Sequence, residues 1–253
     1  MPKRMWAEYL EAFHARNPGI TEDVLLRSTN GGLNPYQWLA QSLPARGRVL
    51  DLACGSAPIF EVREWEEWVG LDRSDAELAK AGERGAAPLI KGDATSLPFP
   101  SASFQAVVCS MAIMLLQPLD IVLSEIHRVL VPGGTAAFML PGSRPLTAGD
   151  LLFYGRLMVS LRQSHLAYPN DRRLARMGHV FRASGFELAS DERVGFSYTF
   201  DDNTSARRFV DSLYLPSATA SRVNRAYACA ERRIGGDVGV PLRRVIVRSA
   251  PST

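Results

Sequence analysis

The sequence predicts an α/β fold: a doubly wound, Rossmann-like and mostly parallel sheet with helices on both faces. Three short apolar runs carry or end in an acidic residue, and these acids, Asp51, Asp72 and Asp93, are spaced about twenty-one residues apart. Helical patterns separate the runs, as in βαβ units. Acids at the carboxyl ends of neighbouring parallel strands are typical of a nucleoside site at the edge of an open sheet.

The amino-terminal section predicts three helices before the first strand. In residues 3–16, Trp6, Tyr9, Leu10 and Phe13 recur at helical spacing. Asn17-Pro18-Gly19 ends that helix, and Thr21 is the predicted N-cap of a short helix over 22–28. Asn34 with Pro35 begins a third helix that extends to residue 43. These helices precede the sheet, so they are expected to pack across it or over the ligand site.

The middle of the chain alternates between strands and helices. The predicted strands are 48–53, 67–71, 87–91, 104–109 and 135–140. The predicted helices between them are 58–64, 75–84, which begins after Ser74, and 118–130, with a turn at Pro132-Gly133-Gly134 before the fifth strand. This order predicts right-handed crossovers and a parallel sheet.

After Pro141 the pattern changes to longer helices. We expect helices over 145–165, 171–184, 204–214 and 218–233, and strands over 186–200 and 240–248. The first of these helices is apolar on one predicted side, formed by Leu151, Leu152, Tyr154, Leu157, Met158 and Leu161.

Composition fits one globular α/β domain in a chain of 253 residues, with 46% hydrophobic and 22% charged residues. No apolar run of about 18 residues predicts a membrane span, and the first residues lack the apolar segment of a signal peptide. The three cysteines, Cys54, Cys109 and Cys229, show no paired or metal-ligand spacing. We therefore expect reduced thiols, a cytoplasmic location and no metal site.

Charge is divided unevenly along the chain. Residues 1–140 hold 12 basic and 16 acidic residues, whereas residues 141–253 hold 17 arginines and 10 acidic residues. A basic half is compatible with nucleic acid or an anionic ligand. The arginines are scattered in pairs with few aromatic residues between them, so nucleic-acid binding is not the favoured interpretation.

Residues 48–58, Arg-Val-Leu-Asp-Leu-Ala-Cys-Gly-Ser-Ala-Pro, form the most informative motif, because an apolar strand runs into a turn of small residues that lets a ligand approach the backbone. Together with the later acids, this motif resembles the class I S-adenosylmethionine-dependent methyltransferases, especially the ubiquinone/menaquinone C-methyltransferase branch. The resemblance covers roughly residues 34–140. The family usually has glycine where Ala57 stands, and often where Ala53 stands, and Pro58 is a further departure.

The resemblance implies a seven-stranded sheet with its last strand antiparallel. It implies a single domain, residues 1–253, with a helical cap over 1–44, a cofactor-binding core over 45–140, and a remainder over 141–253. In that remainder, helical insertions at about 145–170 and 203–233 would form a lid. The implied cofactor is S-adenosyl-L-methionine, and the implied acceptor is a small, partly apolar molecule that receives a methyl group by in-line displacement.

The same resemblance implies cofactor contacts for individual residues. Asp51, Ala53, Cys54 and Gly55 would lie beside the methionine part, Asp72 would accept from the ribose hydroxyls, and Arg73 would lie along the adenine. Asp93 would accept from the adenine amino group and the Ala94 N–H would donate to the ring. Ser110 and Met111 would lie next to the sulfonium, and Tyr36 would cover the cofactor. For the acids, helix capping, a solvated loop position or an Asx turn are alternative structural interpretations.

Methyl transfer needs a base only if the acceptor must lose a proton. The catalytic residue is therefore left unknown, with His14, Tyr154 and His165 as weak candidates. Alternatives are an RNA methyltransferase or an S-adenosylmethionine-binding protein without transferase activity. A nicotinamide dehydrogenase is disfavoured because the turn lacks the Gly-x-Gly-x-x-Gly spacing. A homodimer is compatible with the sequence.

Overall fold

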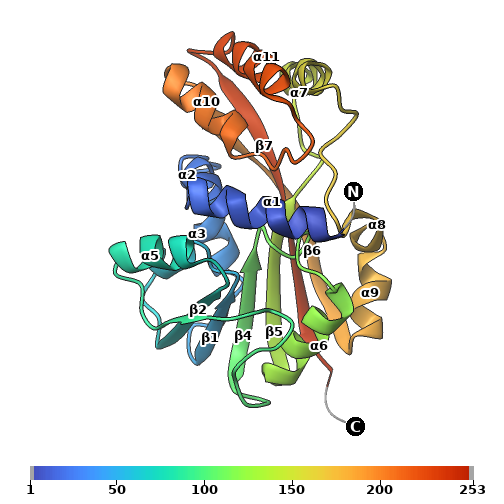
Figure 1. Ribbon diagram of the computed structural model, residues 1–253. Coiled ribbons are helices and arrows are strands. Elements are labelled where there is room, and N and C mark those ends of the chain that lie inside the picture. Colours follow the sequence, from blue (N-terminus) through green and yellow to red (C-terminus); the bar gives the residue numbers. More distant parts are fainter. Residues whose placement is uncertain (1–2, 251–253) are drawn as a thin grey trace.

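The computed structural model describes residues 3–250. It contains one seven-stranded sheet (Figure 1). The strand order is β3-β2-β1-β4-β5-β7-β6. The strands are β1 (Arg48–Leu52), β2 (Glu67–Asp72), β3 (Leu89–Lys91), β4 (Phe104–Ser110), β5 (Leu130–Pro141), β6 (Phe186–Thr199) and β7 (Asp237–Ser249). Strand β7 pairs antiparallel with both β5 and β6, and all pairs formed among strands β1 to β5 are parallel. The predicted fold class and the antiparallel last strand are confirmed.

Eleven helices lie within the described residues. They are α1 (Lys3–Arg16), α2 (Ile20–Leu26), α3 (Pro35–Ala40), α4 (Pro58–Glu61), α5 (Asp75–Glu83), α6 (Leu119–Val129), α7 (Ala148–Leu161), α8 (Asp171–Leu174), α9 (Met177–Ala183), α10 (Asn203–Asp211) and α11 (Ala220–Glu231). Local sequence explains several starts. Asn34 and Gln37 form a capping box at α3, and the Ser74 hydroxyl accepts from the Glu77 N–H at α5.

Alternate residues of the central strands face two separate cores. Leu50 and Val107 belong to a cluster that includes residues of α6 and α9, such as Ile126 and Phe181. Val49, Val108 and Ala137 belong to a second cluster, with Tyr36 and Leu39 of α3. The central strands are therefore buried on both faces, as expected for a parallel sheet covered by helices.

Helices α1, α7, α10 and α11 lie at or beyond the carboxyl edge of the sheet (Figure 1). Figure 1 shows α1 crossing this edge, with α7, α10 and α11 grouped at the upper end of the molecule. Those three helices and the extended ends of β6 and β7 share a third apolar cluster, which includes Phe153, Leu157, Tyr198 and Phe209. Val24 of α2 joins the same cluster, so α2 connects the upper helices to the sheet.

Several element predictions were wrong in detail. Thr21 is not an N-cap: α2 begins at Ile20, two residues before the predicted start, after Gly19 in a left-handed conformation. The Thr21 hydroxyl donates to the Ser212 carbonyl. The helix over 171–184 is broken into α8 and α9. Helix 58–64 is only four residues long, and β5 includes the predicted turn at 132–134.

The buried face of α7 also differs from the prediction. Phe153, Leu157 and Leu161 point inward, whereas Leu151 and Leu152 are exposed. The helical spacing of the apolar residues was predicted correctly. However, α7 is apolar on two sides, so the sequence could not tell which side packs against the rest of the protein. None of the helices in residues 3–250 is long and apolar enough to cross a membrane.

Candidate cofactor site

The turn between β1 and α4 has a backbone conformation that small residues favour. Ala53, Gly55 and Ala57 all have positive φ, at 54°, 54° and 56°. Left-handed conformations cost an alanine roughly 1–2 kcal/mol relative to right-handed ones, and glycine avoids this cost. This explains why glycines suit positions 53 and 57. Pro58 fits as the first residue of α4, where its missing N–H is not needed.

Asp72 at the end of β2 fixes this turn. Its Oδ2 accepts a hydrogen bond from the Gly55 N–H at 2.9 Å, and its Oδ1 accepts from the Ser74 N–H at 2.8 Å. The carboxylate therefore joins the ends of two neighbouring strands, which brings the predicted Asp51 and Asp72 sites together. Burial raises the pKa of Asp72, and the two N–H donors act against that rise.

Asp51 lies beneath the turn with its side chain buried. Within the described part of the chain, neither carboxylate oxygen of Asp51 has a hydrogen-bond partner, and the same is true of the Ser56 hydroxyl. Burial, together with the charges of Asp72 and Glu22, raises the pKa of Asp51 well above its ordinary value. An unpartnered buried carboxylate is costly unless a cation or donor reaches it.

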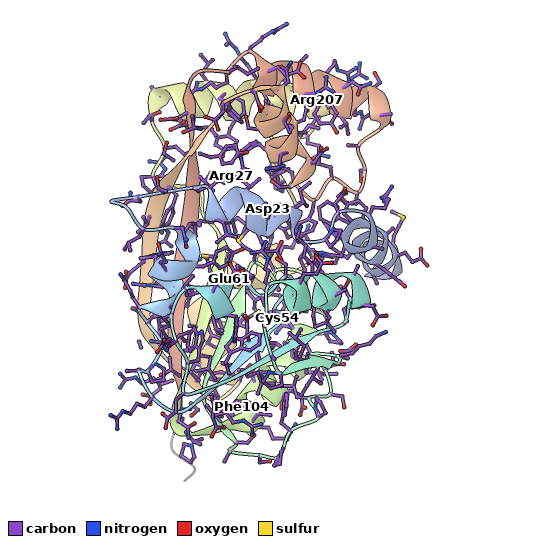
Figure 2. The ribbon with its side chains drawn as sticks, turned by 90° about the vertical axis from the view of Figure 1, so that its left-hand side faces the viewer. Asp23, Arg27, Cys54, Glu61, Phe104 and Arg207 are labelled. Carbon is purple, nitrogen blue, oxygen red and sulfur yellow. The ribbon has the colours of Figure 1, made fainter. Side chains whose placement is uncertain are left out.

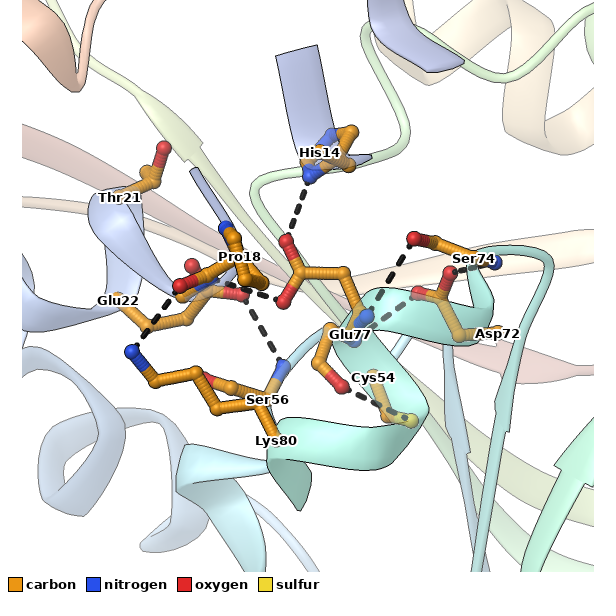
Figure 3. A network of polar contacts seen from close by, with 12 residues as sticks. His14, Pro18, Thr21, Glu22, Cys54, Ser56, Asp72, Ser74, Glu77 and Lys80 are labelled. Carbon is orange, nitrogen blue, oxygen red and sulfur yellow. Dashed lines mark hydrogen bonds and ion pairs between the residues drawn. The ribbon is translucent and has the colours of Figure 1, made fainter. Parts of the chain in front are cut away.

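Two further carboxylates, Glu22 and Glu77, complete an acidic cluster, which we define as Glu22, Asp51, Asp72 and Glu77. Figure 3 shows Glu22, Asp72 and Glu77 around the turn. One oxygen of Glu77 lies 2.7 Å from His14 Nδ1, and the other accepts from the Gly19 N–H at 2.9 Å. Glu22 Oε1 lies 3.4 Å from the Ser56 N, over the turn. Elements α1, α2, α5 and the 53–57 turn thus meet at one point.

The titration of the cluster reflects crowding of like charges. Burial raises the pKa of Glu22 to about 7, and the charge of Glu77 adds to the rise. Burial alone would lower the pKa of His14, but its hydrogen bond to Glu77 and the surrounding acids raise it overall. When protonated, His14 is the cation that these acids hold most directly, and it can balance the charge of one carboxylate.

Salt bridges on the outer side attach α2 to the core. Arg84 reaches both Asp23 of α2, at 3.2 Å, and Glu61 of α4, at 3.4 Å. Lys80 Nζ donates to the Pro18 carbonyl at 3.0 Å. Figure 2 shows Asp23 and Arg27 of α2 between Cys54 of the turn and Arg207 of α10. The amino-terminal helices therefore cover the turn.

The other predicted cofactor residues surround the same edge. Arg73 is exposed and interacts electrostatically with Asp93, whose Oδ1 accepts from the Thr95 N–H and hydroxyl at 2.8 and 2.6 Å. The Thr95 donors lower the pKa of Asp93. Asp93 therefore forms the Asx turn that was considered as an alternative, and its carboxylate is exposed. Ala94, beside it, is buried.

Cys54 at the end of β1 and Tyr36 of α3 are also close to the acidic cluster. The Cys54 thiol is buried and its pKa is raised by burial and by Asp51. Tyr36 is buried, and besides burial the charges of Glu22 and Asp51 raise its pKa. Met111 follows Ser110 at the end of β4 with φ of 54°, and its N–H donates to the Met139 carbonyl.

The three weak base candidates lie in different places. His14 belongs to the cluster. The Tyr154 hydroxyl donates to the Gly239 carbonyl, and Tyr154 packs against the apolar cluster of the upper helices. His165 is exposed, and its Nδ1 lies 2.9 Å from the Ser164 hydroxyl. The structure brings only His14 to the turn.

Aromatic side chains adjoin the cluster on the side of α1. Phe13 and Tyr214 have ring centroids 4.8 Å apart, and His14 and Tyr214 are 5.9 Å apart. Tyr168 meets Tyr214 edge-on at 6.5 Å. These rings place a buried aromatic cluster next to the acidic turn.

Sequence reasoning missed Glu22 and Glu77. Glu77 stands three residues after Ser74, so its spacing indicates only a capping box. In the structure its carboxylate instead holds Gly19 and His14, which are about sixty residues away in the chain. Glu22 carries no sequence signal of its own, because only the packing of α2 brings it to the turn.

The fold is an open α/β sheet with a candidate ligand site at its carboxyl edge, and comparisons with known proteins give its class. Residues 50–138 match the family model described as a methyltransferase domain. The chain is 32% identical over 165 residues to the demethylmenaquinone methyltransferase of Deinococcus radiodurans, covering 55% of this chain and 67% of that protein. The chain belongs to the class I S-adenosylmethionine-dependent methyltransferase family.

Other similarities are shorter or concern the fold. The chain is 36% identical over 104 residues to the 2-phytyl-1,4-naphtoquinone methyltransferase of Synechococcus elongatus, which is 36% of this chain and 45% of that protein. It is 34% identical over 119 residues to the malonyl-[acyl-carrier protein] O-methyltransferase of Alcanivorax borkumensis, 44% of this chain and 40% of that protein. The matches therefore span less than half the length of these two relatives.

Among solved structures, an N-methyltransferase of Haemonchus contortus in complex with phosphomonomethylethanolamine and S-adenosylhomocysteine aligns with a TM-score of 0.58 and 18% identity, covering 98% of this chain and 60% of that one. The [4+2]-cyclase SpnF aligns with a TM-score of 0.53 and 20% identity, covering 86% and 81%. At this identity the similarity concerns the fold.

Replacing Ala53, which has a left-handed backbone conformation, by glycine should stabilise the turn. We expect Ala53→Gly to raise the free energy of unfolding by about 0.5–1.5 kcal/mol, because glycine adopts positive φ without the steric cost. Thermal or urea unfolding measures this. The control Ala79→Gly, in the regular helix α5, should lower stability by about 1 kcal/mol. Equal losses in both variants would contradict the strain argument.

Neutralising Glu22 should stabilise the protein at high pH. A carboxyl whose folded pKa is raised from 4.5 to about 7 favours the folded state most when it is protonated. Its unfavourable contribution is therefore absent below about pH 4.5 and complete above about pH 7. We expect Glu22→Gln to add about 1–3 kcal/mol more stability at about pH 8 than at about pH 5.

Thermal unfolding of wild type and variant at both pH values measures this difference. Glu83→Gln, which changes an exposed glutamate on α5, is the matched control and should show no such pH dependence. A Glu22→Gln gain that is the same at both pH values would contradict a burial-raised pKa.

Proposed function

We propose that the chain binds S-adenosyl-L-methionine at the 53–57 turn and transfers its methyl group to a small, partly apolar organic acceptor. The observation that carries the proposal is the buried Asp51 carboxylate, unpartnered within residues 3–250, beneath a tight turn and inside an acidic cluster. Family membership and the methyltransferase match over residues 50–138 support it.

The chemistry of the site fits this cofactor. When bound, S-adenosylmethionine supplies a methyl group on a positively charged sulfonium and carries an ammonium group as well. The acidic cluster has four carboxylates and one imidazole, so a cationic ligand would relieve its charge repulsion. A Cβ at Gly55 would come within 2.1 Å of Glu22 Oε1, so this turn tolerates close approach only while position 55 lacks a side chain.

Individual residues would hold different parts of the ligand. Asp72 would accept from the ribose hydroxyls with lone pairs not used by Gly55 and Ser74. Asp93 and the Ala94 N–H would contact the adenine edge, with Arg73 along its face. Asp51, Ala53, Cys54 and Gly55 would lie along the methionine part. Ser110 and Met111 would face the reacting centre, and Tyr36 would lie beneath it.

Ligand entry requires Glu22 to leave the turn. Its carboxylate accepts from the Ser56 N–H and fills the space above Gly55. Because Arg84 and Lys80 attach α2 and the preceding turn to the core, displacement of α2 would break these contacts. We propose that residues 1–44 act as a cap over the core at 45–140, and that the helices within 145–170 and 203–233 complete the cover.

The acceptor would meet the aromatic surface formed by Phe13, Tyr168 and Tyr214. Planar, apolar acceptors suit such rings, and two relatives are named as quinone-type methyltransferases. Exclusion of water by these rings and orientation of the acceptor would supply most of the rate enhancement in a displacement of this kind.

If the acceptor must lose a proton, His14 is the base that the geometry favours. Glu77 lies 2.7 Å from its Nδ1, so in the neutral form of His14 an Nδ1–H directed at Glu77 would leave Nε2 to accept a proton. An imidazole oriented by a carboxylate is a common arrangement in general-base catalysis. Tyr154 and His165 have no such partner near the turn.

A second candidate is binding of the cofactor without methyl transfer. The [4+2]-cyclase that shares this fold is named for a different reaction, so the fold alone does not fix the chemistry. Methyl transfer to any acceptor in a screen would decide for the transferase.

Calorimetric titration of the purified chain with S-adenosylmethionine and S-adenosylhomocysteine tests the binding step. We expect roughly micromolar dissociation constants, and Asp51→Asn or Asp72→Asn should weaken binding at least about tenfold. The loss follows from removing a charge or a ribose acceptor. Asp75→Asn, an exposed acid at the start of α5, is the matched control and should bind normally.

Thermal unfolding of each variant separates lost contacts from lost folding. Absence of binding by the folded wild-type chain would refute the proposal. Normal binding by Asp51→Asn would show that the Asp51 carboxylate does not hold the cofactor, which would contradict the argument for the proposal.

A further inference from the structure

Helix α7 presents three large aliphatic side chains to solvent at one end of the molecule. Leu151, Leu152 and Val159 are 59%, 55% and 77% exposed. The opposite side of the helix, with Phe153, Leu157 and Leu161, is buried in the apolar cluster of the upper helices. A helix that is apolar on both sides normally has both sides covered.

Arginines frame this apolar face. Helical spacing places Arg156 between Leu152 and Val159, and Arg162 just beyond Val159, and both are exposed. Arg232 lies near as well, because both it and Arg156 act on the thiol of Cys229, which contacts Ser160 of α7. We call Leu151, Leu152, Val159, Arg156, Arg162 and Arg232 the α7 face.

The surrounding helices are strongly basic. Residues 148–162, 203–212 and 220–233 carry eight arginines and three acidic residues. All three acids are engaged, since Asp150 pairs with Arg233, Glu231 with Arg207, and Asp211 accepts from the Tyr227 hydroxyl. Within the described residues, Arg156, Arg162 and Arg232 form no ion pair. Figures 1 and 2 place α7, α10 and Arg207 at the upper end of the molecule, which the extended end of β7 also reaches.

We propose that the α7 face binds the surface of an anionic lipid bilayer. The three aliphatic side chains would enter the boundary between headgroups and acyl chains, and the arginines would contact lipid phosphates. Charge complementarity supports this occupant, because arginine guanidinium groups match phosphate oxygens. Anionic lipids attract such basic segments within about one Debye length.

A protein partner fits the same face less well. A stable protein interface buries about 800 Å² on each partner, far more than three partly exposed side chains on one helix supply. The excess of unpaired arginines also disfavours a second copy of this chain, since like charges would meet across a two-fold axis. The lipid contact does not depend on methyl transfer, so it is tested separately from the proposed function.

Flotation of the full chain with lipid vesicles tests the proposal. One set of vesicles is phosphatidylcholine alone and the other contains phosphatidylglycerol as well. We expect the chain to float with the anionic vesicles at about 0.1 M salt, much less with phosphatidylcholine, and less again at about 1 M salt because screening shortens the range of attraction.

Variants then locate the contact. Leu152→Ser combined with Val159→Ser should reduce vesicle binding at least about tenfold, because two inserted side chains are lost. Arg156→Glu combined with Arg162→Glu should abolish the preference for anionic vesicles. Ile121→Ser, which changes a 47% exposed residue on α6, is the matched control and should bind like wild type. The changed side chains are exposed, so unchanged thermal unfolding confirms that each variant folds.

Three results would overturn the proposal. The first is absence of flotation by wild type with both kinds of vesicle. The second is flotation that the α7 variants and the α6 control affect equally. The third is concentration-dependent self-association that the α7 variants abolish, without vesicle binding, which would assign the face to a second copy of the chain.

Discussion

The hydrogen bonds of one carboxylate, Asp72, determine the geometry of the whole site. By accepting from Gly55 and Ser74, Asp72 joins the turn after β1 to the start of α5. That connection sets the left-handed path of residues 53–57 and the position of Glu77. Glu77 in turn holds Gly19 and His14, so the cover formed by α1 and α2 depends on the same carboxylate.

Repulsion among buried acids is the consequence of this geometry. Asp51 lies beneath the turn without a partner within residues 3–250, and Glu22 lies above it with a pKa raised to about 7. A fold tolerates such a cluster when a ligand compensates for its cost, and functional sites are where such perturbed groups gather. The crowded acids therefore destabilise the structure around the turn. A cationic ligand would relieve this repulsion, and the proposed activity uses such a ligand.

The upper helices face a different environment. They share an apolar core with the ends of β6 and β7, and α2 links this core to the turn through Val24 and Glu22. A contact made at α7 is therefore connected through packed elements to the cover of the cofactor site. If the α7 face binds a bilayer as proposed, these packed elements would connect the membrane contact to the candidate site.

The sequence by itself determined the order of strands and helices along the chain, the turn of small residues after the first strand and the three acids at the strand ends. These features depend on local periodicity, capping and small residues, which are properties of neighbouring positions. Only the tertiary structure decided that Glu22 and Glu77 join Asp51, that His14 rather than Tyr154 or His165 reaches the turn, and that Leu151 and Leu152 face outward. Those facts depend on how α1, α2 and α7 pack against distant elements, and residues that meet only through packing leave no pattern in the chain.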